Sequence, residues 1–217
     1  MPLLLRLYED VFAGNAEASF PALARFIFVA HGWVTMANRT LHDDDALGSE
    51  GALRCKAGAD GATIWRWELA AGGNGVATGS GVGSSEKLSA RLETLPKGAL
   101  LLRGDSVAFP PGGCAYLHRH QGPGIRCLIE GGIRIDAGGR SISYGPGGAW
   151  YESGPEPVFA QAADRPTRFI RVMLLPLAYL GKSSVEYLRE EDKPKPKTQS
   201  YKIYADMPIG PRLSPAS

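Results

Sequence analysis

The sequence contains one His-X-His group, His118-Arg119-His120. In a β-strand, residues i and i+2 point to the same side, so the two imidazoles would meet at one point. Imidazole nitrogens bind divalent transition metals such as Fe, Mn, Ni or Zn when a third protein ligand and an open position complete the site. The pattern therefore indicates either a metal centre or a pair of hydrogen-bonding histidines without a metal.

The segment around these histidines resembles the first motif of the cupin superfamily. That motif is a glycine, five residues, His-X-His, three or four residues, a glutamate, six residues and a glycine. Gly112, His118, His120 and Gly131 stand at its spacings. The resemblance covers about residues 98–176 and implies a double-stranded β-helix, or jelly-roll barrel, that holds its site inside. Cupins as a family include dioxygenases, isomerases, decarboxylases and hydrolases, so the resemblance implies no single reaction.

The second cupin motif, in which Pro-X-Gly precedes a further histidine, is similar to Pro146-Gly147-Gly148. Two of the four usual ligand positions differ, because Gly124 stands in place of the glutamate and Tyr151 in place of the second-motif histidine. Only the two histidines carry over as ligands. Candidate replacements are Glu152, which a bulge in its strand would turn inward, and Gln121 beside the His-X-His group. The alternative for Glu152 is a carboxylate that faces solvent.

Arg126 follows the position of the missing glutamate by two residues. If Gly124 occupies an inward position, residues 126 and 128 also face the barrel interior. A buried guanidinium needs an anion. Arg126 therefore either forms a permanent pair with Glu152 or Glu130, or binds a carboxylate or phosphate of a small ligand.

Three functions are consistent with these residues. The first is a metal-dependent enzyme that acts on a small anionic metabolite, with His118 and His120 holding the metal and Arg126 binding a carboxylate. The second is a metal-free acid-base enzyme, similar to some sugar-epimerising cupins, with a histidine as base and Tyr151 as proton donor. The third is a non-catalytic barrel that binds or senses a small molecule.

Short apolar segments, separated by many of the 28 glycines and 16 prolines, must position these residues. Segments rich in β-branched and aromatic residues predict an all-β sandwich or barrel. Gly131-Gly132 and Gly138-Gly139 flank Ile133-Arg134-Ile135 and predict a hairpin there. Weak helical periodicity near residues 84–95 and 183–191 indicates a turn or two of helix. The predicted strands are residues 26–29, 33–36, 63–67, 125–129, 133–135 and 169–173.

Residues 25–36 resemble residues 124–135, at an offset of 99, and both read as strand, glycine turn, strand. The repeat predicts two tandem barrel-like halves. Residues 1–83 would form a degenerate cupin-like half, and residues 84–180 the cupin domain that carries the site. The glycine-rich stretch 72–83 is the expected seam between them.

Residues 181–217 are expected to form an extended tail. Lys193-Pro194-Lys195-Pro196-Lys197 cannot form a helix and favours an extended conformation. Residues 199–204 read as one more strand, which would pack along the edge of a barrel. The resemblance to cupins, together with this strand, implies a homodimer.

Composition limits the partners and the compartment. The formal charge of +2 is scattered along the chain, so the sequence predicts no nucleic-acid partner. No window approaches the roughly 20 apolar residues of a membrane helix, and a membrane partner is not expected. The three cysteines, Cys55, Cys114 and Cys127, are widely spaced, which argues against a disulfide framework and favours the cytoplasm. A small molecule is the expected partner.

Overall fold

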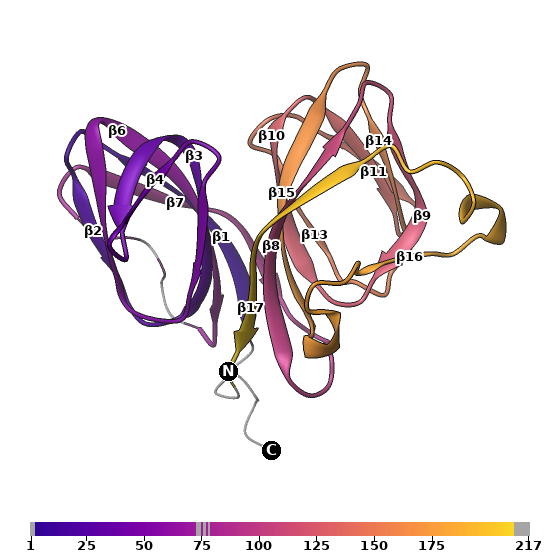
Figure 1. The fold of residues 1–217 in the computed structure, drawn as a ribbon, viewed down its shortest axis with the longest axis horizontal. Helices are drawn as coiled ribbons and strands as arrows, with labels where there is room; N and C mark the ends of the chain where they lie inside the picture. The colour runs from indigo at the N-terminus through magenta and orange to yellow at the C-terminus, as the bar shows by residue number, and fades with distance from the viewer. Residues whose placement is uncertain (1–2, 73–74, 76, 78, 211–217) are drawn as a thin grey trace. The chain divides into compact units, whose positions relative to one another are not determined.

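The computed structural model describes residues 3–72, 75, 77 and 79–210, and they form two compact units built almost entirely of strands. The first unit runs to Leu92 and takes in Ile209 and Gly210; the second is Glu93–Pro208. Each unit is a rolled antiparallel β-structure (Figure 1). Among the described residues, no helix has the length and apolar character needed to cross a membrane.

The first unit is one seven-stranded sheet in the order β4-β3-β6-β1-β7, with β2 paired to β6 and β5 paired to β3. Its inner face buries apolar side chains such as Phe12, Ile27, Val34 and Ile64. The strands are β1 (Leu4–Phe12), β2 (Glu17–Phe20), β3 (Ala24–Met36), β4 (Arg39–His42), β5 (Ala46–Ser49), β6 (Leu53–Ala70) and β7 (Val82–Arg91).

The second unit has two five-stranded sheets, β13-β10-β15-β8-β17 and β12-β11-β14-β9-β16. Two 3₁₀ turns, Leu177–Tyr179 and Glu190–Asp192, flank β16. The strands are β8 (Leu100–Phe109), β9 (Cys114–His120), β10 (Gly124–Glu130), β11 (Ile133–Ala137), β12 (Arg140–Tyr144), β13 (Ala149–Glu152), β14 (Val158–Ala162), β15 (Thr167–Pro176), β16 (Val185–Tyr187) and β17 (Ser200–Ile209).

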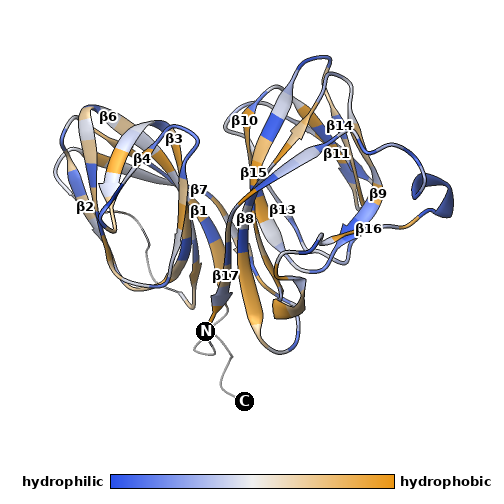
Figure 2. Cartoon of the chain, in the orientation of Figure 1, coloured by the Kyte–Doolittle hydropathy of each residue, from blue (hydrophilic) through white to orange (hydrophobic). Residues whose placement is uncertain are grey.

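The two sheets of the second unit enclose an apolar core that includes Leu128, Ile133 and Phe169. The predicted hairpin is confirmed: β11 pairs with β12 across Gly138 and Gly139, whose φ angles of 55° and 73° suit the tight turn. Figure 2 shows that blue, polar segments interrupt the orange, apolar strands, and some of these polar residues are buried inside the barrel.

Three local expectations were wrong. Residues 84–95, expected to include helix, instead contain most of β7, because pairing with β1 outweighs a weak helical pattern. Residues 183–191 hold β16 and the start of a 3₁₀ turn. Residues 26–29 and 33–36 belong to one strand, β3, whose register shifts near Gly32 where a hairpin turn was expected.

The units also divide the chain differently from the expected domains. The boundary expected after residue 83 falls inside β7, while the chain passes from the first unit to the second between Leu92 and Glu93. The expected seam, residues 72–83, lies partly outside the described residues. The strand predicted at residues 199–204 coincides from Ser200 onward with the start of β17, which extends the sheet beside β8. β16 pairs with β9.

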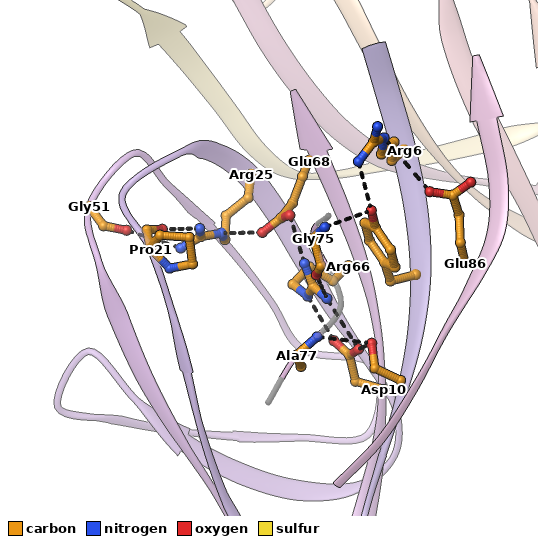
Figure 3. Close-up of polar contacts among 12 residues, drawn as sticks. Arg6, Asp10, Pro21, Arg25, Gly51, Arg66, Glu68, Gly75, Ala77 and Glu86 are labelled. Carbon is orange, nitrogen blue, oxygen red and sulfur yellow. Dashed lines mark hydrogen bonds and ion pairs between the residues drawn. The ribbon is translucent and has the colours of Figure 1, made fainter. Parts of the chain in front are cut away.

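The interior of the first unit holds a chain of buried ion pairs (Figure 3). The Arg66 guanidinium binds the Asp10 carboxylate at 2.7 Å and lies 2.7 Å from Glu68, which in turn accepts a 3.1 Å hydrogen bond from Arg25. All four side chains are almost completely buried, and the Tyr8 ring packs 4.5 Å from the Arg66 guanidinium. Fixed ion pairs thus fill part of the first unit's interior.

Candidate active site of the second unit

His118 and His120 come together inside the second unit, as the His-X-His spacing predicts. Both lie on β9 and point to the same side, so their Nε2 atoms are 3.2 Å apart and their ring centroids 4.8 Å apart. Both side chains are buried. The pair is shielded by β16, which pairs with β9 and places the Tyr187 ring 6.1 Å from that of His118.

The hydrogen bonds of the pair indicate where its protons lie. His118 Nδ1 is 2.7 Å from the carbonyl oxygen of Tyr116, so Nδ1 carries a proton and donates it. In the neutral ring, His118 Nε2 is then a bare acceptor, which His120 Nε2–H can reach. His120 Nδ1 is buried and has no hydrogen-bond partner among the described residues.

Burial keeps this pair neutral. Desolvation lowers the pKa of His118, although the charge of Glu152 partly opposes the shift. Desolvation, followed by the positive charges of Arg126 and Arg171, lowers the pKa of His120 well below its usual value. At neutral pH the site therefore offers two uncharged imidazoles.

Glu152 reaches the histidines from β13. Its Oε2 lies 3.4 Å from His120 Nε2, while its Oε1 accepts a 2.8 Å hydrogen bond from Trp150 Nε1. The inward direction needs no bulge, because β10 and β13 pair in continuous register with Gly124 opposite Glu152. The bulge expected from the sequence is absent, and Glu152 itself occupies the inward position.

Arg126 faces the interior, where the inward count from Gly124 places it. Its Nη2 lies 2.7 Å from Glu152 Oε2, and its Nη1 donates a 2.7 Å hydrogen bond to the carbonyl oxygen of Gly124. Desolvation lowers the pKa of Arg126 to about 10, against the opposing effect of Glu152. Of the two anions considered from the sequence, the described structure pairs Arg126 with Glu152, whereas Glu130 binds Arg168.

A second buried guanidinium, Arg171, was not singled out in the sequence. It makes a bidentate ion pair with Asp105, with Nε–Oδ1 and Nη2–Oδ2 distances of 2.9 and 2.7 Å. The central carbon of its guanidinium lies 5.9 Å from the centre of the Tyr201 ring. The signal was available, because Arg171 interrupts the apolar run Phe169-Ile170-Arg171-Val172-Met173 just as Arg126 interrupts its own strand.

His120 lines two cavities. An inner cavity of about 20 Å³, room for about one water molecule, is lined by both histidines, Arg126, Glu152 and Arg171 among others. A wider pocket of about 270 Å³ lies at the rim of the barrel. Its walls are residues 94–96, 119–123, 153 and 155. Of these two spaces, the rim pocket is the one large enough for a metabolite.

Gln121 and Tyr151 lie away from the inner cavity. Gln121 lines the rim pocket and donates a 3.1 Å hydrogen bond to Glu186, which also binds Arg119. Tyr151 is adjacent to Glu152 on β13 and therefore points to the opposite face of the strand. Burial raises the pKa of Tyr151 above its usual value.

Close packing against β15 explains the glycines at positions 122 and 124. A Cβ on Gly122 would collide with the carbonyl oxygen of Leu174, and one on Gly124 with that of Val172. The backbone of β15 thus takes the space beside them. The same contact explains why the usual cupin glutamate is not accommodated at position 124.

The donors do not form a complete metal site as they stand. Among the described residues, no group of three or more His, Cys, Asp or Glu side chains is arranged to hold an ion. The histidine pair has suitable spacing, but the carboxylate beside it is bound by the Arg126 cation on one oxygen and by Trp150 on the other. Gln121, the other replacement considered, bonds to Glu186 instead.

No family model matches the sequence, and neither does any curated protein. Solved structures do match. The oxalate decarboxylase OxdC of Bacillus subtilis is 13% identical, with a TM-score of 0.63 over 88% of this chain and 73% of that chain. An oxalate decarboxylase of Lactobacillus farciminis is 11% identical, with a TM-score of 0.64 over 88% and 82%.

A salicylate 1,2-dioxygenase of Pseudoaminobacter salicylatoxidans matches more weakly, at 11% identity and a TM-score of 0.53 over 79% of this chain and 70% of that chain. Identities this low carry the fold and no function. The barrel of the second unit, the first-motif spacing and these matches together show that the chain has the cupin fold.

Proposed function

We propose that the second unit binds a small polar metabolite in its rim pocket and transfers a proton to or from it without a metal. The observation that carries this proposal is the His118–His120 pair, whose Nε2 atoms are 3.2 Å apart and whose rings are buried and neutral. A neutral imidazole held in one tautomer is the usual group for general acid-base chemistry.

His120 is the member of the pair that can exchange a proton with a ligand in the rim pocket. It contributes to the walls of both the inner cavity and the rim pocket. Its Nδ1 has no partner among the described residues and is the free basic atom of the pair. The ion pair of Arg126 and Glu152 orients His120 from the other side.

The charges of the site favour a polar ligand without a strong anionic group. Arg126 is bound by Glu152 and Arg171 by Asp105, so a carboxylate would have to displace one of these partners. This differs from the metal-dependent alternative, in which a metal supplies the charge for an anionic substrate. Bacillus subtilis oxalate decarboxylase has Mn(II) centres, but its likeness to this chain extends to the fold alone.

The proposal is tested by a search for ligands followed by a proton-exchange assay. Sugars, sugar lactones, amides and small carboxylates are screened by thermal shift in the presence of a chelator. Compounds that bind are then incubated with protein in D₂O, and exchange of carbon-bound protons is followed by NMR. The proposal predicts exchange that persists in chelator and is lost in His120→Ala but kept in His42→Ala, an exposed histidine of the first unit.

Two outcomes would favour a different function. Near-stoichiometric metal in protein purified without chelator or tag, lost in His118→Ala/His120→Ala, would restore the metal-dependent function. Binding without any exchange would favour a non-catalytic barrel, which the small size of the inner cavity also supports.

A further inference from the structure

Three donors lie beside the inner cavity, and two of the distances between them are typical of metal ligands. The two Nε2 atoms are 3.2 Å apart, and His120 Nε2 is 3.4 Å from Glu152 Oε2. Ligands that each lie about 2.1 Å from one ion are roughly 3 to 3.5 Å from each other. These two edges therefore have the length that coordination requires, although the set as a whole is not closed around an ion.

A cation already occupies this place. The Arg126 side chain is 1% exposed, and its Nη2 lies 2.7 Å from the same Glu152 oxygen that approaches His120. The guanidinium is locked there by its second bond, from Nη1 to the carbonyl oxygen of Gly124. Because Arg126 cannot move toward solvent without breaking both contacts, its charge is a permanent part of the site.

A second buried guanidinium beside the histidines, that of Arg171, has a counterpart in the first unit. Arg171 of β15 is bound by Asp105 of β8, and in the first unit Arg66 of β6 is bound by Asp10 of β1. Both pairs join the long central strand to the same neighbour, since β15 pairs with β8 and β6 with β1. An arginine and carboxylate pair between these two strands is thus common to both units, although Asp105 lies directly opposite Arg171 and Asp10 lies two positions from the residue opposite Arg66.

Arg126 has no such counterpart. It stands opposite Arg171 across β10 and β15, and the residue in the corresponding register of the first unit, opposite Arg66, is Ile27. An apolar residue can therefore occupy this position in a barrel of this type. The first unit also buries an arginine of β3, Arg25, but its partner Glu68 belongs to the chain of ion pairs within that unit. The carboxylate that binds Arg126 instead approaches His120, which ties Arg126 to the histidine site.

We propose that the guanidinium of Arg126 takes the place of a metal ion in this barrel. It supplies the positive charge that Glu152 requires, and it repels a divalent cation from the donors that would otherwise bind one. The inference extends the metal-free function proposed above, on which it rests. Its consequence is that removal of one side chain should turn the cluster into a divalent-metal site.

The test measures metal affinity directly. Wild-type protein and Arg126→Ala are stripped of metal and titrated with Co(II) and with Zn(II), followed by visible absorbance and by calorimetry. We expect the variant to bind one equivalent at least roughly 100-fold more tightly than the wild type, because a positive charge in contact with the site has been removed. The Co(II) spectrum should indicate nitrogen and oxygen ligands.

Two further sets of variants identify the site. The gain should be lost in Arg126→Ala/Glu152→Ala and in Arg126→Ala/His118→Ala. Arg119→Ala is the matched control, because Arg119 lies between the two histidines in sequence but points outward to Glu186, and it should gain nothing. If Arg126→Ala does not fold, Arg126→Ile places in the wall the residue that the first unit has there, and it is titrated instead.

The possible failures are distinct. A folded Arg126 variant that binds metal no better than the wild type would overturn the inference and leave the metal-free function standing. A wild-type protein that binds one equivalent of metal through His118 and His120 would overturn both.

Discussion

At the scale of single residues, the site consists of charges and imidazoles that satisfy one another inside a barrel. Glu152 is the connection between them, because it lies 2.7 Å from Arg126, 3.4 Å from His120 and 2.8 Å from the Trp150 indole nitrogen. A buried charge that loses its partner costs far more than the pair contributes. The site should therefore tolerate removal of both charges better than removal of one.

The first prediction follows from this asymmetry. Glu152→Gln keeps an acceptor for Trp150 but leaves the Arg126 charge without an anion, and we expect it to lower the free energy of unfolding by about 3–5 kcal/mol. The double variant Arg126→Met/Glu152→Leu should recover most of that loss. Urea denaturation measures both, and Glu186→Gln, which breaks an exposed pair, should change little. Equal effects of Glu152→Gln and Glu186→Gln would contradict the buried pair.

The second prediction concerns pH. Burial lowers the pKa of both histidines, so below about pH 6.5 the unfolded chain binds more protons than the folded one. The contribution to stability is complete above that pH and is lost as the pH falls toward the folded pKa values, at up to about 1.4 kcal/mol per pH unit for each histidine.

Urea denaturation at a series of pH values between about 5 and 8, the range in which histidine usually titrates, measures this slope. His118→Gln/His120→Gln should flatten it, whereas His42→Gln should not. An unchanged slope in the double variant would mean that other groups determine the pH dependence.

At the scale of elements, the C-terminal segment is part of the second barrel. Arg103 of β8, 2% exposed, makes a two-pronged ion pair with Asp206 of β17, at 3.0 and 2.8 Å. Its other bonds go to the carbonyl oxygens of Lys182 and Tyr179, and Asp206 also accepts the backbone N–H of Gly181. The buried guanidinium of Arg103 thus connects β8 to β17 and to the turn before β16.

The third prediction tests whether the Arg103–Asp206 pair stabilises β17. Asp206→Asn removes the charge that Arg103 needs, and we expect faster hydrogen exchange across residues 200–209 with a loss of about 3 kcal/mol in the free energy of unfolding. Hydrogen-exchange mass spectrometry locates the change. Asp136→Asn, which breaks an exposed pair with Arg134, is the control. Unaltered protection of β17 would show that its backbone pairing alone holds it.

At the scale of the whole molecule, both units bury ion pairs, but to different ends. In the first unit the pairs of Asp10, Arg66, Glu68 and Arg25 satisfy one another, and its two histidines, His31 and His42, are exposed. In the second unit two of the ion pairs, Arg126–Glu152 and Arg171–Asp105, lie beside the buried histidines. The chemistry proposed here is therefore assigned to the second unit, and a homodimer and a cytoplasmic location stay predictions.

The fourth prediction is that the first unit depends on its ion pairs. Arg66→Met leaves Asp10 without its guanidinium and should cost about 3–5 kcal/mol. Tryptophan fluorescence during urea unfolding reports on this unit, because Trp33, Trp65 and Trp67 lie in it and Trp150 in the other. Lys56→Gln, which breaks an exposed pair with Glu17, is the control. A loss no larger than that of the control would contradict a structural role.

The sequence by itself determined the features that depend on local geometry. Strand alternation was enough to predict that His118 and His120 converge. Together with the cupin resemblance, which placed Gly124 at an inward position, it also predicted that Arg126 faces the interior. Turn glycines were enough to predict the hairpin between β11 and β12. Each of these follows from residues close together along the chain.

Only the tertiary structure decided which residues meet across strands. It placed Glu152 rather than Glu130 on Arg126, paired Arg171 with Asp105, and turned Gln121 toward Glu186. It also made a strand of residues 82–91, because β1 offered a partner that a local pattern cannot reveal. Sequence periodicity gives the direction of a side chain along its own strand, whereas its partner depends on strand order and register, which distant segments establish together.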